Sequence, residues 1–495
     1  MASLSELVYQ DRKDWNEEKI RTLFSEVLQA RYKRVEDISS KKNDEKRFQL
    51  RVNASSSDDN IPFAALVAPN QDLSGPYGGM SLVFFPSDAQ TGKPALIAMG
   101  VGTNGAAPDE YVLGRPGHAR RCDAITRLLR SRSAEAFAWA KRDPTRVDVD
   151  LPQSVRDRLE DWQGAIKRYG KVLYAVFSPP PTQTRANVVL VEDAIDAFLD
   201  LCLKDRGLQL RTSVVAKAEE TQREAMKAYT PKLDDESVLE LLLSRKYVVV
   251  EGPPGTGKTS MARRMLANNF EERGFIVQFH PGTTYEGFVG GLAPDSENAE
   301  LKFVPRRGHL LDAIVSARRE PSRRFLMVID EINRADLAKI LGEAIYLLEP
   351  GEPERSIRLQ YDFPEIGHDV SLPENLYILG TMNSADRSIA ILDIAVRRRF
   401  AFVTMWPDIE VVEKKSCQQL LRAFQQLQVI FTDFATDSSF VLMPGHSYFL
   451  GNESEAKQKL DTGVRPLLEE YLSQGYVSGF ADEIRAYVDT VLVRE

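Results

Sequence analysis

The stretch that most constrains the fold is GPPGTGKTS at residues 252–260, directly after the apolar run KYVVVE. It has the spacing G-x-x-x-x-G-K-[ST], in which glycines let backbone N–H groups turn around phosphate oxygens. The apolar run before it predicts a buried strand, and the residues after it predict a helix. A strand, a glycine-rich loop and a helix in this order predict a phosphate-binding loop beside a parallel sheet.

We expect this loop to hold a nucleoside triphosphate, with two of its residues in distinct roles. Lys258 should reach the β- and γ-phosphates, and the Thr259 hydroxyl should help to hold Mg²⁺. The expected nucleotide-binding set is Gly252, Pro253, Pro254, Gly255, Thr256, Gly257, Lys258, Thr259 and Ser260. Because such a loop contacts only phosphates, the sequence leaves ATP and GTP open as the substrate.

Two carboxylates stand side by side at the end of another apolar run, RFLMVIDE, residues 324–331. Beside a phosphate loop, Asp330 is expected to hold Mg²⁺, and Glu331 to polarise the attacking water as general base. The alternative is an ordinary acidic turn between a strand and a helix. A third apolar run, NLYILGT, leads to Asn383, and strand ends of this kind point at the ligand cleft. We expect Asn383 to sense the γ-phosphate and to position water with Glu331.

Three consecutive arginines close the segment SIAILDIAVRRRF, residues 388–400. Cations are favourable at a helix C-terminus, which is one explanation for them. The functional explanation is that one or two of them reach the γ-phosphate bound to a neighbouring subunit and stabilise transition-state charge in trans. Arg398 and Arg399 are the preferred candidates for this catalytic role, and the choice between them and Arg397 stays open.

The length of the chain and the changing pattern of its segments indicate several domains, because 495 residues are more than a single hydrophobic core usually holds. The segment Leu4–Asp37 has helical spacing, and SLVFFP and PALIAMGVG read as buried strands. Strands and helices alternate later in the chain, and its last part reads as helical. The expected division is an α+β target- or partner-recognition domain at 1–210, a linker at 211–234, an α/β core at 235–403 and a helical lid at 404–495.

Composition limits the surroundings and the partners of the chain. No apolar run reaches the ~18 residues that span a bilayer, so no membrane association is expected. Three cysteines without a close pair suit a reducing cytoplasm, where we expect the protein. The net charge of −8 excludes a uniformly basic coat for nucleic acid. A local patch remains possible at residues 115–146, where His118, Arg120, Arg127 and Trp139 could contact DNA, the alternative being a solvated helix with core aromatics.

The motifs together resemble the AAA+ superfamily and, within it, the McrB family of motor subunits of modification-dependent restriction systems. The resemblance covers about residues 235–480. It is carried by GPPGTGKT, FHPGTTYEGFVGGLAP, DEINRADLAKILGEAIYLLE, LPENLYILGTMNSADRSIAILDIAVRRRF, GHSYF and RPLLEEYL. Ser384 stands where the family more usually has Thr, which keeps the hydroxyl.

The resemblance implies an α/β AAA+ core, a helical C-terminal lid and a separate N-terminal domain that selects a target, often modified DNA. It implies a homo-hexameric ring with nucleotide between subunits, GTP as the usual nucleotide, and stimulation by a separate endonuclease subunit in defence against foreign DNA. Tyr285 and Phe288 could lie near a central pore or the nucleotide, or be core aromatics. The alternative is a MoxR-like AAA+ ATPase that remodels protein complexes, with MNSADRS and FHPGTTYEGFVGG favouring the McrB-like interpretation.

Overall fold

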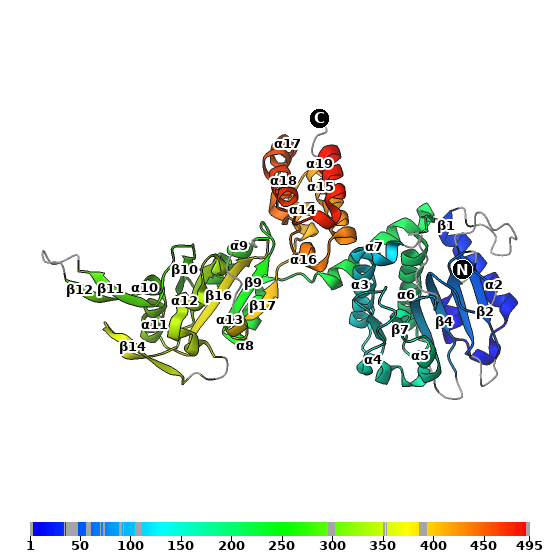
Figure 1. The fold of residues 1–495 in the computed structure, drawn as a ribbon, viewed down its shortest axis with the longest axis horizontal. Helices are drawn as coiled ribbons and strands as arrows, with labels where there is room; N and C mark the ends of the chain where they lie inside the picture. Colours follow the sequence, from blue (N-terminus) through cyan, green and yellow to red (C-terminus); the bar gives the residue numbers. More distant parts are fainter. Residues whose placement is uncertain are drawn as a thin grey trace. The chain divides into compact units, whose positions relative to one another are not determined.

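The chain folds into two compact units in a computed structural model (Figure 1). Residues 1–231 with 432–435 form the N-terminal unit, and residues 232–431 with 436–495 form the C-terminal unit. The structure describes residues 3–33, 35, 48–55, 61–69, 71–72, 75–88, 92, 94–103, 111–204, 206–295, 302–349, 352, 354–385 and 394–491.

The N-terminal unit is built on an antiparallel six-stranded sheet with the strand order β2-β3-β4-β5-β7-β6. Strand β3 alternates, with Ala64 and Leu66 in one apolar cluster and Ala65 and Val67 in another, so both faces of the sheet are buried. The expected strands SLVFFP and PALIAMGVG are confirmed as β4 and β5. The strands are β2 Gln49–Asn53, β3 Phe63–Val67, β4 Met80–Phe85, β5 Leu96–Val101, β6 Phe137–Ala140 and β7 Leu173–Ser178.

Helices cover this sheet on both sides. The helical spacing of Leu4–Asp37 corresponds to two helices, α1 and α2, because the chain leaves the first helix and begins a new one. The side chains of Asp11 and Asn16 accept hydrogen bonds from the N–H groups of Lys13 and Lys19, which starts each new turn. The helices are α1 Ser5–Tyr9, α2 Glu17–Arg31, α3 Pro116–Arg132, α4 Gln153–Arg158, α5 Gln163–Tyr169, α6 Arg185–Lys204 and α7 Thr212–Tyr229; β1 Tyr32–Lys33 pairs with β8 Gln209–Leu210.

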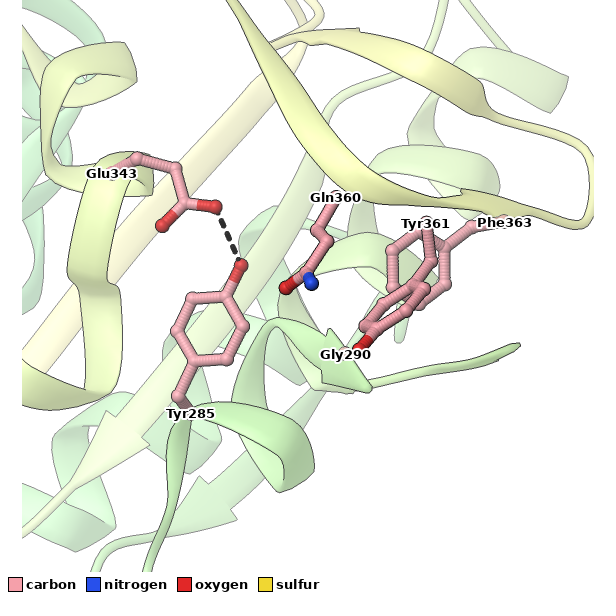
Figure 2. A pocket seen from close by; sticks show the side chains of 6 residues that line it. All are labelled: Tyr285, Gly290, Glu343, Gln360, Tyr361 and Phe363. Carbon is pink, nitrogen blue, oxygen red and sulfur yellow. Dashed lines mark hydrogen bonds between the residues drawn. The ribbon is translucent and has the colours of Figure 1, made fainter. Parts of the chain in front are cut away.

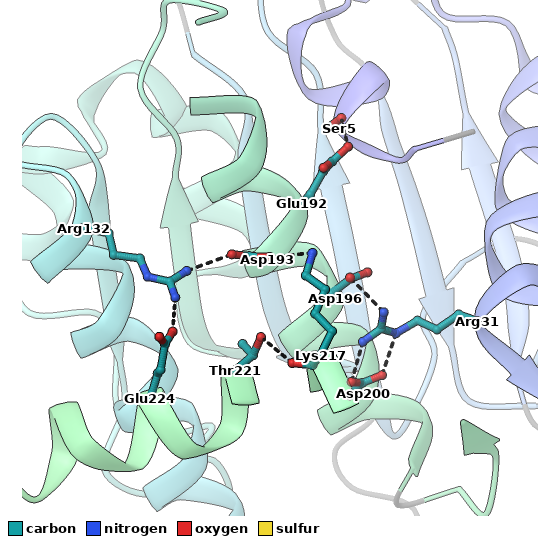
Figure 3. Close-up of polar contacts among 10 residues, drawn as sticks. All are labelled: Ser5, Arg31, Arg132, Glu192, Asp193, Asp196, Asp200, Lys217, Thr221 and Glu224. Atoms are coloured by element: carbon teal, nitrogen blue, oxygen red, sulfur yellow. Dashed lines mark hydrogen bonds and ion pairs between the residues drawn. The ribbon is translucent and has the colours of Figure 1, made fainter. Parts of the chain in front are cut away.

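Helix α7 belongs to the N-terminal unit, whereas the sequence suggested that it forms a linker (Figure 3). The Asp193 carboxylate on α6 forms ion pairs at 2.9 Å with both Lys217 of α7 and Arg132 of α3. Asp200, two turns further along α6, pairs at 2.6 Å with the buried Arg31 at the end of α2. Carboxylates at this spacing lie on one helix face, so a single face of α6 joins three neighbouring helices.

The basic stretch 115–146 is less available to nucleic acid than its composition suggested. His118 is buried and its Nε2 lies 3.1 Å from the Tyr174 hydroxyl, so it cannot stack on a base. Arg120 is buried as well, and Arg127 pairs with Asp123 on its own helix. These residues therefore contribute mainly to packing and to local ion pairs.

The C-terminal unit contains a five-stranded, fully parallel sheet with the order β10-β13-β16-β9-β17. Alternate residues of β9 enter different clusters, Val249 on one side and Val248 and Val250 on the other, as expected for a parallel sheet buried on both faces. The four strands expected from the apolar runs KYVVV, FIVQF, RFLMVID and NLYILGT are confirmed as β9, β10, β13 and β16, and β17 is added at the edge. The strands are β9 Tyr247–Gly252, β10 Gly274–Gln278, β13 Phe325–Asp330, β16 Leu376–Asn383 and β17 Ala401–Thr404.

Helices and two antiparallel hairpins surround this sheet, and a helical segment follows it, as expected for an AAA+ fold. The core helices are α8 Asp235–Arg245, α9 Lys258–Asn269, α10 Tyr285–Phe288, α11 His309–Arg319, α12 Leu337–Leu341 and α13 Ile394–Arg397. The hairpins are β11 Gly290–Pro294 with β12 Phe303–Arg307, and β14 Ser356–Phe363 with β15 Gly367–Ser371. The final helices are α14 Ile409–Lys415, α15 Gln418–Phe434, α16 Asp437–Phe440, α17 Glu453–Lys459, α18 Arg465–Ser473 and α19 Ala481–Val491. Across the described residues, every helix is too short or too polar to cross a bilayer.

Candidate nucleotide-binding site

The glycine-rich loop connects the end of β9 to the first turn of α9. Gly255 and Gly257 have φ angles of +80° and +91°, a region that side chains with a Cβ rarely adopt. Gly257 is the N-cap of α9, so the free N–H groups of that helix begin where the loop ends. Such an arrangement favours a bound anion. The Thr256 hydroxyl donates to the Pro253 carbonyl at 3.0 Å and helps to hold the loop in this shape.

The C-terminal helical segment supports the loop from outside the sheet. The N–H of Gly445 donates to the Pro254 carbonyl at 2.9 Å, and the N–H of Ser447 donates to the Gly255 carbonyl at 3.0 Å. A Cβ on Gly445 would lie 2.1 Å from the carbonyl carbon of Gly255, so only glycine permits this approach. The GHSYF motif therefore fixes the phosphate loop through backbone contacts.

Lys258, which is expected to bind the phosphates, is buried beneath the phosphate loop. Its Nζ donates to the carbonyls of Gly252 and Pro253 at 2.9 and 2.8 Å. Burial lowers the pKa of Lys258 to about 8, although the nearby carboxylates of Glu331 and Asp330 act in the opposite direction. This ammonium group is therefore close to its titration point at neutral to mildly alkaline pH.

Nucleotide affinity should consequently fall as the pH rises through about 8, the pKa of Lys258. The charged form predominates below this pH and binds phosphate, whereas the neutral form predominates above it. Well above the pKa, the dissociation constant should rise about tenfold per pH unit. Titrating a fluorescent ATP or GTP analogue from pH 7 to pH 9.5 measures this slope. Lys258→Arg is the control, since its guanidinium stays charged; an equal slope in both proteins would contradict the assignment.

Asp330 and Thr259 provide neighbouring oxygen atoms at the carboxyl end of β13. The Thr259 hydroxyl donates to Asp330 Oδ1 at 2.8 Å, and Asp330 is buried. A carboxylate and a hydroxyl are the hard ligands that Mg²⁺ accepts, and the ion usually completes its shell with phosphates and water. Among the described residues no group of three or more His, Cys, Asp or Glu side chains forms a metal cage. The donor set fits a Mg²⁺ ion bound together with a nucleotide.

Glu331 and Asn383 lie together at the ends of β13 and β16, as the sequence suggested. The Asn383 amide donates to Glu331 Oε1 at 2.7 Å, and Arg334 lies 3.5 Å from Oε2. Burial raises the pKa of Glu331, while Arg334 lowers it. The backbone of Glu331 is left-handed, with φ 56° and ψ 46°, which is uncommon for a residue with a side chain and is found at functional turns.

Thr381 is a site residue that the sequence did not single out. This buried side chain lies in β16, and its hydroxyl donates to Asp330 Oδ1. The Thr381 hydroxyl oxygen in turn accepts a hydrogen bond from the N–H of Glu331 at 3.2 Å. One hydroxyl thus binds the Asp330 carboxylate and the backbone N–H of Glu331 at the left-handed turn, which makes Thr381 a positioning residue. The run LYILGTM gave no signal of this role, because threonine is common in strands for its β-branched shape.

Replacing Thr381 by valine should lower kcat for nucleotide hydrolysis by about 10- to 100-fold, the range expected for losing a hydrogen bond to a charged group. The KM for nucleotide should change much less, because Thr381 lies below the carboxylates and is not part of the loop. Thr381→Ser, which keeps the hydroxyl, should retain most of the activity. Equal activity of the valine and serine variants in a phosphate-release assay would contradict the positioning role of the Thr381 hydroxyl.

The three arginines at the end of α13 have different surroundings. Arg399 has a side chain only 7% exposed, and it lies 3.2 Å from Glu349 and donates to the Ala395 carbonyl. Arg398 has a side chain 61% exposed and lies 3.5 Å from the same carboxylate. Arg397 lies over the Phe402 ring, 4.8 Å from its centroid. Arg399 is therefore a buried cation, whereas the side chains of Arg397 and Arg398 are 52% and 61% exposed. A catalytic role of Arg398 or Arg399 in a neighbouring subunit stays a prediction.

Several known proteins are similar to parts of this chain. Residues 247–400 match the AAA domain of the dynein-related subfamily. The chain is 29% identical over 359 residues to the type IV methyl-directed restriction enzyme EcoKMcrB subunit of Escherichia coli (strain K12), covering 65% of this chain and 75% of that one. It is also 29% identical over 196 residues to the type II restriction enzyme BsuMI component YdiS of Bacillus subtilis (strain 168), covering 31% of this chain and 55% of that one.

A solved structure of NtrX from Brucella abortus in complex with ATP aligns with 57% of this chain and 75% of its own, at 11% identity and a TM-score of 0.26. The AAA domain, the parallel sheet with its phosphate loop and the two restriction-enzyme relatives agree with one another. The chain contains an AAA+ nucleoside triphosphatase domain and is similar to the McrB subunit of a restriction enzyme.

Proposed function

We propose that this chain is the motor subunit of a restriction system that hydrolyses ATP or GTP in a homo-hexameric ring. In this system it drives DNA recognition or translocation together with a separate endonuclease subunit, in defence against foreign DNA. The main support for the system is the likeness to the EcoKMcrB subunit over 65% of the chain, because that protein is named as a restriction enzyme subunit. The carboxylates and hydroxyls around the phosphate loop support hydrolysis of a nucleoside triphosphate as the reaction.

Within this proposal the residues of one subunit have defined tasks. The loop and Lys258 bind the phosphates, and Thr259 and Asp330 hold Mg²⁺, which would neutralise phosphate charge when bound. Glu331 accepts a proton from the attacking water, and Asn383 orients that carboxylate. The hydrogen bond of 2.7 Å between Asn383 and Glu331 is the observation that carries this assignment.

The proposal assigns Arg398 to the active site of a neighbouring subunit. Among the described residues its ion pair is with Glu349, while Lys258, Asp330 and Glu331 interact with other groups of their own site. An exposed cation that makes no such contact with its own site is suited to act on phosphate bound elsewhere. Hydrolysis would then require assembly, since each active site is completed by another subunit.

Phosphate release with ATP and with GTP, each with and without DNA, tests the proposed function. Glu331→Gln serves as the blank for contaminating phosphatases. A preference for GTP and a change of rate with DNA would support the restriction motor. Turnover with ATP that DNA does not alter would contradict this proposal and favour a MoxR-like remodelling ATPase.

A further inference from the structure

A small pocket of about 230 Å³ lies in the C-terminal unit, among residues to which the nucleotide chemistry gives no role (Figure 2). Four elements form it, namely α10, β11, the 3₁₀ helix Gly342–Leu348 and β14. A register irregularity in β14 between Arg358 and Phe363 lets two consecutive side chains line it together. Its lining residues are Tyr285, Gly290, Glu343, Gln360, Tyr361 and Phe363.

The lining of the pocket has a negative charge and aromatic faces. Tyr285 donates its hydroxyl to Glu343 Oε1 at 2.8 Å. Burial and this carboxylate raise the pKa of the Tyr285 phenol, so it remains a donor. Tyr361 and Phe363 pack edge to face, with ring centroids 6.3 Å apart. No basic side chain is among the six lining residues, so the carboxylate has no cationic partner within the pocket.

The nearest cation by strand register is already paired. Arg307 stands opposite Gly290 in the hairpin of β11 and β12. Its guanidinium lies 2.8 Å from Asp312 and 3.0 Å from Glu365, so two other carboxylates neutralise it. Glu343 is therefore left to attract a cation from outside.

An apolar strip leads from the pocket along the hairpin. A Cβ on Gly290 would lie 2.6 Å from the Phe363 ring, so this face of β11 points to the pocket wall. Leu292 lies on the same face two residues later, and Phe303 is paired with Pro294 on that face too. Leu292 and Phe303 are 45% and 54% exposed, so this apolar strip beside the pocket is open to solvent.

We propose that this pocket binds the arginine side chain of a partner protein segment, with apolar neighbours of that arginine lying on Leu292 and Phe303. The carboxylate of Glu343 and the aromatic faces recognise the planar guanidinium by charge and by cation–π contact. The adjoining apolar strip favours a protein segment over a free small cation. The inference concerns a surface of the AAA+ unit and is independent of the identity of the hydrolysed nucleotide.

Two short peptides with one difference test the proposal on the full-length protein without nucleotide. Acetyl-Leu-Arg-Leu-amide carries the charge, and the same peptide with citrulline keeps the shape but lacks the charge. Saturation-transfer NMR titrations should give weaker binding for the citrulline peptide by about fivefold or more. Glu343→Gln should weaken the arginine peptide by a similar factor. Glu240→Gln removes an exposed carboxylate on α8, outside the pocket, and should leave binding unchanged.

Three results would overturn the proposal. Equal affinity for the arginine and citrulline peptides would exclude recognition of charge. Unchanged binding to Glu343→Gln would exclude the pocket as the site. Equal affinity for acetyl-arginine-amide and the leucine-flanked peptide would exclude a protein segment. The nucleotidase activity enters none of these comparisons, so a failure here is distinct from a failure of the proposed function.

Discussion

Glu331→Gln should lower the rate of nucleotide hydrolysis by about 10²- to 10⁴-fold, the contribution typical of a general base. The amide has the shape of the carboxylate and still offers an oxygen to Asn383, whose amide donates to Glu331 at 2.7 Å. What it loses is the ability to accept the proton of the attacking water. Phosphate release under saturating nucleotide measures the effect as a change in kcat.

Binding separates this catalytic role from a folding defect. Glu331→Gln should bind a fluorescent nucleotide within about threefold of the wild-type affinity, because the lost charge is not part of the phosphate loop. Glu286→Gln, which changes an exposed carboxylate in the same unit, should keep both binding and turnover. Normal turnover of Glu331→Gln would exclude Glu331 as the base.

Arg398→Ala should have an effect of comparable size, because arginines that act in trans contribute about 10³–10⁵ to kcat. Its side chain is 61% exposed, so removing it should leave the folded unit and the melting temperature almost unchanged. Phosphate release and thermal unfolding of the same preparation check the two expectations. Full activity of Arg398→Ala would exclude the arginine from the reaction.

Arg399→Ala provides the contrast, since this neighbouring side chain is 7% exposed and pairs with Glu349 at 3.2 Å. Removing it leaves the Glu349 carboxylate without its buried partner, which should cost roughly 1–3 kcal/mol of stability. The variant is therefore expected to lose melting temperature first and activity as a consequence. Tm separates the two arginines even where both variants lose turnover.

The chemistry-bearing loops were predictable from sequence because their spacing is fixed by the ligand. The glycines of the phosphate loop need left-handed φ angles, and Asp330 follows an apolar strand as the parallel sheet requires. The strands β9, β10, β13 and β16 could be found from apolar runs of strand length, as could the adjacency of Glu331 and Asn383.

Contacts distant in sequence could not be predicted in the same way. Thr381 lies inside a strand, where threonine is common for its β-branched shape alone, so its two hydrogen bonds gave no pattern. Both Arg398 and Arg399 pair with Glu349, and they differ in burial, with side chains 61% and 7% exposed, which a run of three arginines does not reveal. The burial of His118 depends on Tyr174. The hairpin β11–β12 is short, and the pairing of β14 with β15 has a register irregularity, so a sequence pattern does not resolve either hairpin.

Mixing two inactive variants tests the shared active site most directly. Glu331→Gln subunits keep Arg398, and Arg398→Ala subunits keep Glu331, so a mixed ring contains sites at which both groups are intact. Random assembly at equal amounts makes about one quarter of the sites complete, and phosphate release should recover to about that fraction of the wild-type rate. No recovery at any mixing ratio, with both variants still assembling and binding nucleotide, would contradict an arginine supplied by the neighbouring subunit.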